Sequence, residues 1–367
     1  MTRFRTRATI VARALARRLA GPRVRPESPQ RILIAHQLLL GDTLMTVALA
    51  ARLRARCQPA TLAMAMPPAF APLFSGRPYG VEAIAFSPRD PASVQAALAT
   101  GEPGWDWALL PGDNRFSWLA QAMNARWISG WRDDRPAHKN WWVDEPLPWP
   151  AAPDALGDMW ADLIEGPACE YSRTDWPAPT CAPFTQPDAP YAVLHIGASN
   201  PRKFWPATHW QKLAGELQAA GLTVVLSAGR GEEALTRAVD PAGNFVSFAG
   251  RLDLAQLFAL VRDAAVLIAP DTGVAHLGKV TGTPTVALFG RGPTAIYARG
   301  RFWASMPFRA AVLDELPPRP QTTLFRRPFA WLPEASATTL NQADVRYGSG
   351  PAFVLRQAIE IMKKSLT

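Results

Sequence analysis

The stretch FAGRLDLAQLFALVRDAAVLIAPDTGVAHLGKVTGTPTVALFG, residues 248–290, decides the fold of the second half of this chain. Asp253 and Gln256 have the spacing of a capping box, which predicts that a helix begins there. The elements expected after that helix are a strand over 265–268, a helix over 274–281 that Gly282 ends, and a strand over 285–289. Strands that alternate with helices at this spacing indicate a parallel sheet covered by helices on both faces.

The same alternation extends in both directions along the chain. Further strands are expected over 191–196, 222–227 and 245–248 in the second half, and over 31–36, 61–64, 81–86 and 107–110 in the first. Thr208 and Gln211 resemble another capping box, and an apolar periodic helix is expected over 42–56. The sequence therefore predicts an α/β protein of two doubly wound domains, whose ligands bind at the carboxyl ends of the strands.

Length and composition agree with two domains. The 367 residues are 48% apolar, which is enough to fill two cores. No apolar run reaches the roughly 18 residues that a membrane-spanning helix needs. The three cysteines show no metal-ligand spacing, which argues against a zinc site or a disulfide scaffold and favours a reducing compartment.

Positive charge is concentrated in an N-terminal arm. Residues 1–31 hold nine arginines and one acid, Glu27, and so carry +8 of the net charge of +9. A nearly neutral remainder argues against nucleic-acid binding. Residues 10–20 could form an amphipathic helix with Val11, Leu15 and Leu19 opposite Arg13 and Arg17, suited to an anionic membrane surface. A solvated, frayed tail is the equally weighted alternative, and a mitochondrial-type transit segment has a similar composition.

Proline density suggests where the domains meet. Residues 136–190 contain 11 of the 36 prolines, which disfavours regular structure apart from one helix near 154–164. The expected organisation is a basic arm over 1–30, an acceptor-side domain over 31–150, a linker over 151–190, a nucleotide-sugar domain over 191–350 and a C-terminal helix over 351–367.

Three loops of the second domain suit a nucleotide diphosphate. Residues 270–273 (PDTG) open the helix that contains His276, where free N–H groups and the helix dipole attract an anion and Gly273 permits close approach. Residues 197–206 place Ser199 and Lys203 in one loop. In the third loop, after Gly229 and Gly231, a glutamate can accept hydrogen bonds from ribose hydroxyls.

Each of these residues also has an ordinary structural interpretation. Asp271 could be an N-cap, His276 a core histidine and Lys203 a solvated lysine. The partial glycine fingerprint at 229–234 also keeps open a nicotinamide-dependent oxidoreductase, although no acid follows at the expected spacing. The agreement of the three loops on one sheet edge favours the nucleotide-diphosphate hypothesis.

One carboxylate of the first domain is a candidate base. Gly41 and Asp42 follow the first strand, and Asp42 could take a proton from an incoming hydroxyl, or could only cap the helix. The chain has no D-x-D pattern of the kind that holds a diphosphate through a metal. We therefore expect Lys203 and the helix N-terminus to neutralise the diphosphate, with no metal and no cofactor.

Two stretches carry a resemblance to a known family. HIGASNPRKFWPATHWQKLAGEL, residues 195–217, and the 248–290 stretch with its DTG-x-x-H segment resemble glycosyltransferase family 9, the ADP-heptose:lipopolysaccharide heptosyltransferases. The resemblance extends over 191–297 and, more weakly, over 31–56, whereas 1–30 and 300–350 match nothing recognisable. It implies a GT-B type fold, in which two Rossmann-like domains face a central cleft.

The resemblance also implies an activity and a set of site residues. The activity is inverting, metal-independent transfer of a sugar, which is heptose in this family, from an ADP-sugar to a lipid-linked glycan such as the lipopolysaccharide core. It further implies a cytoplasmic enzyme with a peripheral position at the inner membrane. The implied residues are Asp42 as the base, Ser199, Lys203, Asp271, Thr272 and Gly273 at the diphosphate and donor sugar, Glu232 at the ribose with Glu233 as a substitute, and His276 supporting its loop.

Departures from the family pattern concentrate at acceptor-facing positions. His36 stands where a basic residue is usual, and loop 37–40 is the apolar Gln-Leu-Leu-Leu. Arg291 replaces the usual proline after Phe289-Gly290. The alternatives that stay open are a transferase of the same fold with another nucleotide-sugar donor and a non-catalytic nucleotide-sugar-binding protein.

Overall fold

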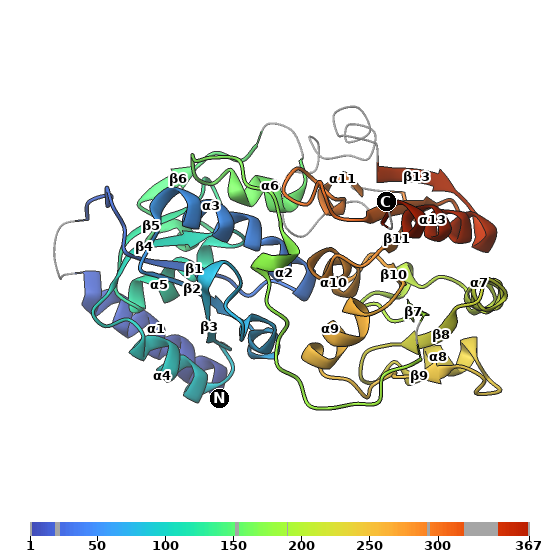
Figure 1. The fold of residues 1–367 in the computed structure, drawn as a ribbon. Coiled ribbons are helices and arrows are strands. Elements are labelled where there is room, and N and C mark those ends of the chain that lie inside the picture. Colours follow the sequence, from blue (N-terminus) through green and yellow to red (C-terminus); the bar gives the residue numbers. More distant parts are fainter. Residues whose placement is uncertain are drawn as a thin grey trace. The chain divides into compact units, whose positions relative to one another are not determined.

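The computed structural model describes residues 2–18, 23–150, 154–188, 190–291, 294–318 and 344–365. The chain divides into two units, the first formed by Met1–Ala151 and Gly157–Cys169 and the second by Ala152–Leu156 and Glu170–Thr367. Each unit contains one parallel sheet with helices packed on it (Figure 1). No helix in the described ranges has the length and apolar character to cross a membrane.

The first sheet has six parallel strands in the spatial order of a Rossmann fold. In that order they are β3 (Val81–Ala85), β2 (Thr61–Met66), β1 (Arg31–Ala35), β4 (Trp105–Leu110), β5 (Ala125–Trp131) and β6 (Glu145–Leu147). The strand order reverses between β1 and β4, so the loops that follow these two strands lie together at the carboxyl edge.

Helices cover this sheet, and their buried side chains form its core. They are α1 (Thr2–Arg18), α2 (Leu40–Met45), α3 (Val47–Cys57), α4 (Pro91–Ala99) and α5 (Ser117–Ala122), followed by α6 (Leu156–Ala161) at the boundary of the units. Helices α1, α4 and α5 share one core cluster with β1, β2 and β4, which places them over the same face (Figure 1).

The second sheet has seven parallel strands and the same order with one strand added. In spatial order they are β13 (Val345–Gly348), β12 (Phe308–Leu313), β11 (Thr285–Phe289), β10 (Val266–Pro270), β7 (Tyr191–His195), β8 (Thr223–Ser227) and β9 (Val246–Ser247). Here the order reverses between β7 and β10.

The helices of the second unit lie on opposite faces of its sheet (Figure 1). They are α7 (Ala207–Ala219), α8 (Glu233–Val239), α9 (Leu254–Arg262), α10 (Gly273–Thr281), α11 (Thr294–Tyr297) and α13 (Gly350–Ser365). Alternate strand residues pack under α7 and α13 in one cluster. The capping box of Asp253 and Gln256 is present, and Gly282 ends α10 in the left-handed conformation at φ 68°, as predicted.

Some local expectations are wrong. Helix α7 has Pro206 as its N-cap, and Thr208 lies inside the helix instead of capping it. The single helix expected over 42–56 is two helices that meet at Thr46, whose hydroxyl donates to the carbonyl oxygen of Thr43, at 2.6 Å.

Four strands lie where none was expected, namely β5, β6, β12 and β13. Strand β12 is buried along its whole length, so it shows no polar–apolar alternation in the sequence. In β5, Ser129 and Gly130 interrupt the apolar pattern, yet the Ser129 hydroxyl accepts a hydrogen bond from the Trp107 indole, at 2.8 Å. Residues 319–343, within the segment that matched nothing recognisable, lie outside the described ranges.

The N-terminal arm is a packed helix and not a frayed tail. In α1, Ile10 and Ala14 are buried against the first unit. The Thr6 hydroxyl donates to the carbonyl oxygen of Pro88, at 2.7 Å. The predicted apolar position Leu19 and the expected helix end at Ala20 lie outside the described residues.

Candidate active site

The candidate donor site lies at the carboxyl edge of the second sheet. Three loops reach this edge: residues 196–206 after β7, residues 228–232 after β8 and residues 271–272 after β10. Because β7 and β10 are neighbours at the point where the strand order reverses, ligands of such sheets bind between their loops.

An ion pair joins the first and third of these loops. The Lys203 ammonium lies 2.9 Å from the Asp271 carboxylate and also donates to the Asp271 carbonyl oxygen. Both side chains are largely buried, with 14% and 12% exposed, so the pair is shielded from water. Burial raises the pKa of Asp271 to about 7, and the positive charge of Lys279 acts in the opposite direction. Lys203 is therefore held in place and is not the solvated lysine of the alternative interpretation.

A glutamate joins the first and second loops. The Glu232 carboxylate accepts a hydrogen bond from the backbone N–H of Gly229, at 2.7 Å. It also fills the space where a side chain at Gly197 would begin, because a Cβ added there would overlap its Oε2 atom. Glu233, the suggested substitute, turns instead toward Gly231 and accepts its N–H at 2.9 Å. Glu232 is thus the glutamate that faces the loop after β7.

Helix α10 begins at this edge without a side-chain cap. Its N-cap is Thr272 and not Asp271, so the N-cap interpretation of Asp271 is wrong. The Thr272 side chain makes no capping hydrogen bond, and its hydroxyl is buried without a partner among the described residues. The first N–H groups of α10, from Gly273 onward, are therefore not capped by this side chain and are suited to an anion.

His276 lies within the core beneath this helix start. Its side chain is 4% exposed, and the ring stacks near Phe308 with a centroid distance of 6.5 Å and an interplanar angle of 11°. Burial, together with the charge of Lys279, holds the pKa of His276 well below its usual value, so the ring is neutral. Its Nδ1 atom is buried and has no hydrogen-bond partner in the described part of the chain. Ser199 is exposed in the loop after β7.

A second buried histidine supports the same edge, and the sequence analysis did not single it out. His195 ends β7, and its Nδ1 atom lies 2.9 Å from the hydroxyl of Ser227, which ends β8. Burial lowers the pKa of His195 to about 4, so it is neutral near pH 7. Its position directly before the 196–206 loop is the sequence signal that could have identified it.

Asp42 lies at the corresponding edge of the first sheet. It sits in the first turn of α2, after β1, and is partly buried. The N-cap of α2 is Leu39, so the alternative in which Asp42 is only an N-cap is wrong. A carboxylate in the first turn is favoured by the helix dipole.

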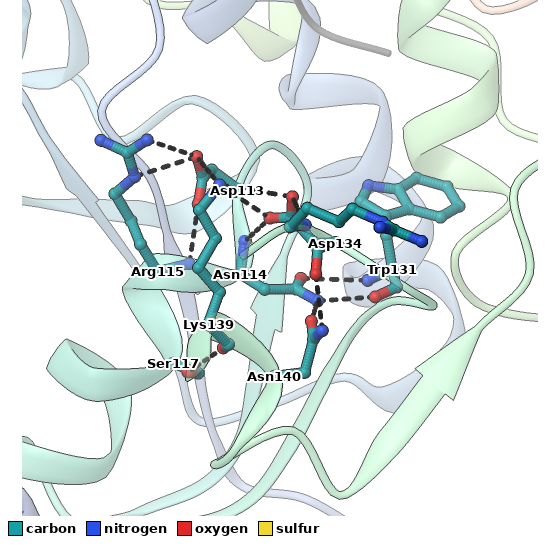
Figure 2. Close-up of polar contacts among 9 residues, drawn as sticks. Asp113, Asn114, Arg115, Ser117, Trp131, Asp134, Lys139 and Asn140 are labelled. Carbon is teal, nitrogen blue, oxygen red and sulfur yellow. Dashed lines mark hydrogen bonds and ion pairs between the residues drawn. The ribbon is translucent and has the colours of Figure 1, made fainter. Parts of the chain in front are cut away.

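A buried charge network fixes the adjacent loops of the first sheet, and it was not predicted. Lys139, whose side chain is 6% exposed, lies 2.9 Å from the Asp113 carboxylate and 3.3 Å from the Asp134 carboxylate (Figure 2). Asp113 follows β4 and Asp134 follows β5, so this lysine ties together two loops at the carboxyl edge. Removal of the lysine would leave two partly buried carboxylates without their shared partner.

The network also holds Arg115 beside Asp113. The Arg115 Nε atom donates to the Asp113 carboxylate at 2.9 Å, and the Arg115 backbone N–H donates at 2.8 Å (Figure 2). Burial acts to raise the pKa of Asp113, but the hydrogen bonds from Arg115 and Lys139 outweigh it and hold the pKa below its usual value. Asp113 is therefore ionised, and the half-exposed Arg115 is oriented by it.

The loop after β1 is apolar, as the sequence indicates. Leu38 packs so closely on Gly112 that a side chain there would overlap its Cδ2 atom. Leu39 is 69% exposed, three residues before Asp42. His36 is fully buried, and burial lowers its pKa to about 3, so it does not supply the positive charge of a basic residue.

The described residues contain no group of three or more His, Cys, Asp or Glu side chains placed to hold a metal ion.

Comparison with known proteins identifies a family that this chain matches. The sequence pattern of glycosyltransferase family 9 (heptosyltransferase) matches residues 104–298, a range that includes the donor-site loops but not Asp42. A relative in Pseudomonas aeruginosa, lipopolysaccharide heptosyltransferase 1, is 32% identical over 129 residues, which is 34% of this chain and 36% of that protein. The matched stretch thus spans about a third of the length of this curated relative.

Two solved structures share the fold. A glycosyl transferase family 9 protein from Veillonella parvula superposes with a TM-score of 0.67 at 14% identity, over 91% of this chain and 97% of that one. E. coli ADP-heptose LPS heptosyltransferase II superposes with a TM-score of 0.66 at 19% identity, over 92% and 100%. These likenesses confirm the predicted α/β fold of GT-B type with two Rossmann-like domains. Because the family pattern matches more than half of its length, the chain belongs to glycosyltransferase family 9, the heptosyltransferase family.

Proposed function

We propose that this protein transfers a heptose from ADP-heptose to a lipid-linked glycan, such as the lipopolysaccharide core, with inversion and without a metal ion. Family membership supports the reaction class, and the P. aeruginosa and E. coli relatives support the sugar and the acceptor class. The observation that carries the proposal is the contact between loops of the second sheet: Lys203 with Asp271, and Glu232 against Gly197.

The donor is held by the second unit. Glu232, at the loop after β8, accepts hydrogen bonds from the ribose hydroxyls, and Ser199 and Lys203 contact the diphosphate. Lys203 is already positioned by Asp271, so little ordering is needed when the diphosphate arrives. The N–H groups at Thr272 and Gly273 supply the rest of the positive potential. His276 supports the start of α10 from within the core.

The acceptor is activated by the first unit. Its hydroxyl oxygen attacks the anomeric carbon opposite the diphosphate, so that one carbon–oxygen bond forms while the bond to ADP breaks. Asp42 takes the hydroxyl proton, a contribution of about 10²–10⁴-fold. The negative charge that develops on ADP is stabilised by Lys203 and by the helix start, which need no rearrangement during the step. In this proposal these two groups stabilise the departing ADP and no divalent metal takes part.

The proposed acceptor implies that the reaction takes place at a membrane surface. A lipid-linked acceptor and a soluble nucleotide sugar meet where the lipid headgroups face the cytoplasm, so we propose a cytoplasmic, peripheral protein at the inner membrane.

ADP release with ADP-heptose as donor tests the proposal, measured with and without a lipid-linked core acceptor. We expect release that depends on the acceptor. If the nucleotide is released from another nucleotide sugar but not from ADP-heptose, the protein is a transferase of different donor specificity. Binding of ADP without any turnover would identify a non-catalytic binding protein, and a thermal shift with NAD(H) but not with ADP would favour an oxidoreductase.

A further inference from the structure

Helix α1 has two faces with different roles. Thr6, Ile10 and Ala14 are buried against the first unit, and α1 packs on α4 and α5. On the outward side, Phe4 is 79% exposed and Leu15 is 53% exposed, and Val11 between them is 37% exposed. At about 100° per residue, these three side chains fall within an arc of about 40°. We call Phe4, Val11 and Leu15 the outer stripe.

The buried contacts determine which way the outer stripe points. The Thr6 hydroxyl bonds to Pro88, and the Arg13 guanidinium donates to the carbonyl oxygen of Leu98 at 3.1 Å. Arg17 forms an ion pair with Glu102. The helix is therefore fixed to the first unit through one side, and the outer stripe is left facing solvent.

The arginines of the arm whose side chains the structure describes include two groups. Those farther along the arm are engaged within the first unit: Arg13 and Arg17 as above, Arg23 in an ion pair with Asp144, and Arg25 3.3 Å from Glu145. Arg5 and Arg7 are exposed, and no acidic side chain of the described residues pairs with either. Helical spacing places these two on opposite sides of the outer stripe.

We propose that the outward face of α1 docks this enzyme on an anionic phospholipid bilayer, with the outer stripe entering the interface and Arg5 and Arg7 contacting headgroup phosphates. This combination of an exposed apolar stripe with flanking cations is the pattern of helices that lie in a membrane interface. The charge is complementary, since residues 1–26 contain no acid. The proposal rests on the proposed function only for its biological setting, because α1 belongs to the first unit and the donor-site loops belong to the second.

Flotation of the full chain with vesicles tests this surface. Wild type is expected to bind vesicles that contain 30 mol% phosphatidylglycerol more tightly than vesicles of phosphatidylcholine alone, and binding should weaken as NaCl is raised. Replacement of Arg5 and Arg7 by Gln should weaken binding by roughly thirty-fold at low salt, since each arginine contributes about 1 kcal/mol and 1.4 kcal/mol is tenfold. The control variant R56Q/R356Q removes two exposed arginines outside α1, and so the same amount of positive charge. It is expected to bind vesicles like wild type.

The outer stripe is tested by F4S/V11S/L15S. These side chains face solvent, so the variant should keep the wild-type melting temperature while its vesicle binding falls by about ten-fold or more. V246S/Y347S, which replaces exposed apolar residues of the second unit, is the matched control. Equal binding by the stripe variant and wild type, or no binding to anionic vesicles by wild type, would overturn the proposal. Wild-type dimerisation that the stripe variant abolishes, without vesicle binding, would assign the stripe to a second copy instead.

The two proposals fail separately. ADP affinity and transfer to an acceptor presented in detergent micelles should be the same in the stripe variant as in wild type. Loss of vesicle binding with normal transfer in micelles supports docking by α1, whereas vesicle binding by a wild-type protein that transfers nothing would refute only the proposed function.

Discussion

The carboxyl edges of the two sheets have the same topology but are built differently. At the second edge, charged side chains from loops near the strand ends contact one another directly, as Lys203 and Asp271 do. At the first edge, the loop after β1 is apolar, and the charge lies in a buried network centred on Lys139. The difference teaches that the same strand order carries two kinds of edge: one where the loop directly after the first strand supplies a charged group, and one where that loop is apolar and a buried lysine joins the neighbouring loops.

The largest expected effect separates the chemical step from donor binding. Asp42→Ala should lower turnover by about 10²–10⁴-fold, because the attacking hydroxyl loses its base, while the affinity for ADP should not change. Asp42→Asn, which keeps the shape, should be impaired to a similar degree. Steady-state kinetics together with calorimetry measure both quantities, and near-normal turnover in either variant would remove Asp42 from the mechanism.

The next effect concerns the framework of the first edge. Lys139→Met leaves Asp113 and Asp134 without their shared cation, and we expect it to destabilise the first unit by about 3 kcal/mol. Hydrogen exchange of β4 and β5 amides reports this loss, with exposed Lys212→Met as the control. The KM for the acceptor should rise and ADP affinity should stay the same. If the amides of β4 and β5 exchange as slowly in the variant as in wild type, the Lys139 network does not stabilise these strands.

A smaller effect is expected at the donor edge. Lys203→Ala removes a charge-assisted contact worth roughly 1.5–3 kcal/mol, so ADP binding should weaken by about ten-fold to a hundred-fold. The variant also takes this cation away from the Asp271 carboxylate, whose negative charge then repels the diphosphate and adds to the loss. Titration calorimetry with ADP measures the change, and Lys212→Ala is the matched lysine variant. An unaltered ADP affinity would contradict the diphosphate role.

The most gradual effect, and the smallest for a change of one pH unit, is the acid sensitivity of the first edge. His36 has a pKa of about 3 when folded and about 6.5 when unfolded, so between these values the unfolded chain binds more protons. Stability should therefore fall as pH drops through this window, by up to about 1.4 kcal/mol per pH unit. His36→Asn should flatten that dependence in urea unfolding at pH 4–6.5. An unchanged slope would mean that other groups dominate, His195 of the second unit among them.

The sequence by itself determined the elements and the motifs of the second edge. The capping box at Asp253, the glycine stop at Gly282 and strand β11 follow from local residue patterns, and these patterns act over a few residues. The PDTG loop and Lys203 could be placed at one edge because parallel strands end at the same side of a sheet. Their direct contact agrees with that placement, whereas their roles in binding stay predictions.

Only the tertiary structure decided the framework of the first edge and the faces of α1. Lys139 meets Asp113 across 26 residues, and strand β12 shows no alternation because it is buried on both sides. The net positive charge of the arm can be counted from the sequence. The contacts of its arginines cannot, because Arg13 bonds to Leu98 and Arg17 pairs with Glu102, both far along the chain. Local propensity reports only on neighbours in sequence, and burial and charge pairing are settled by residues that folding brings together.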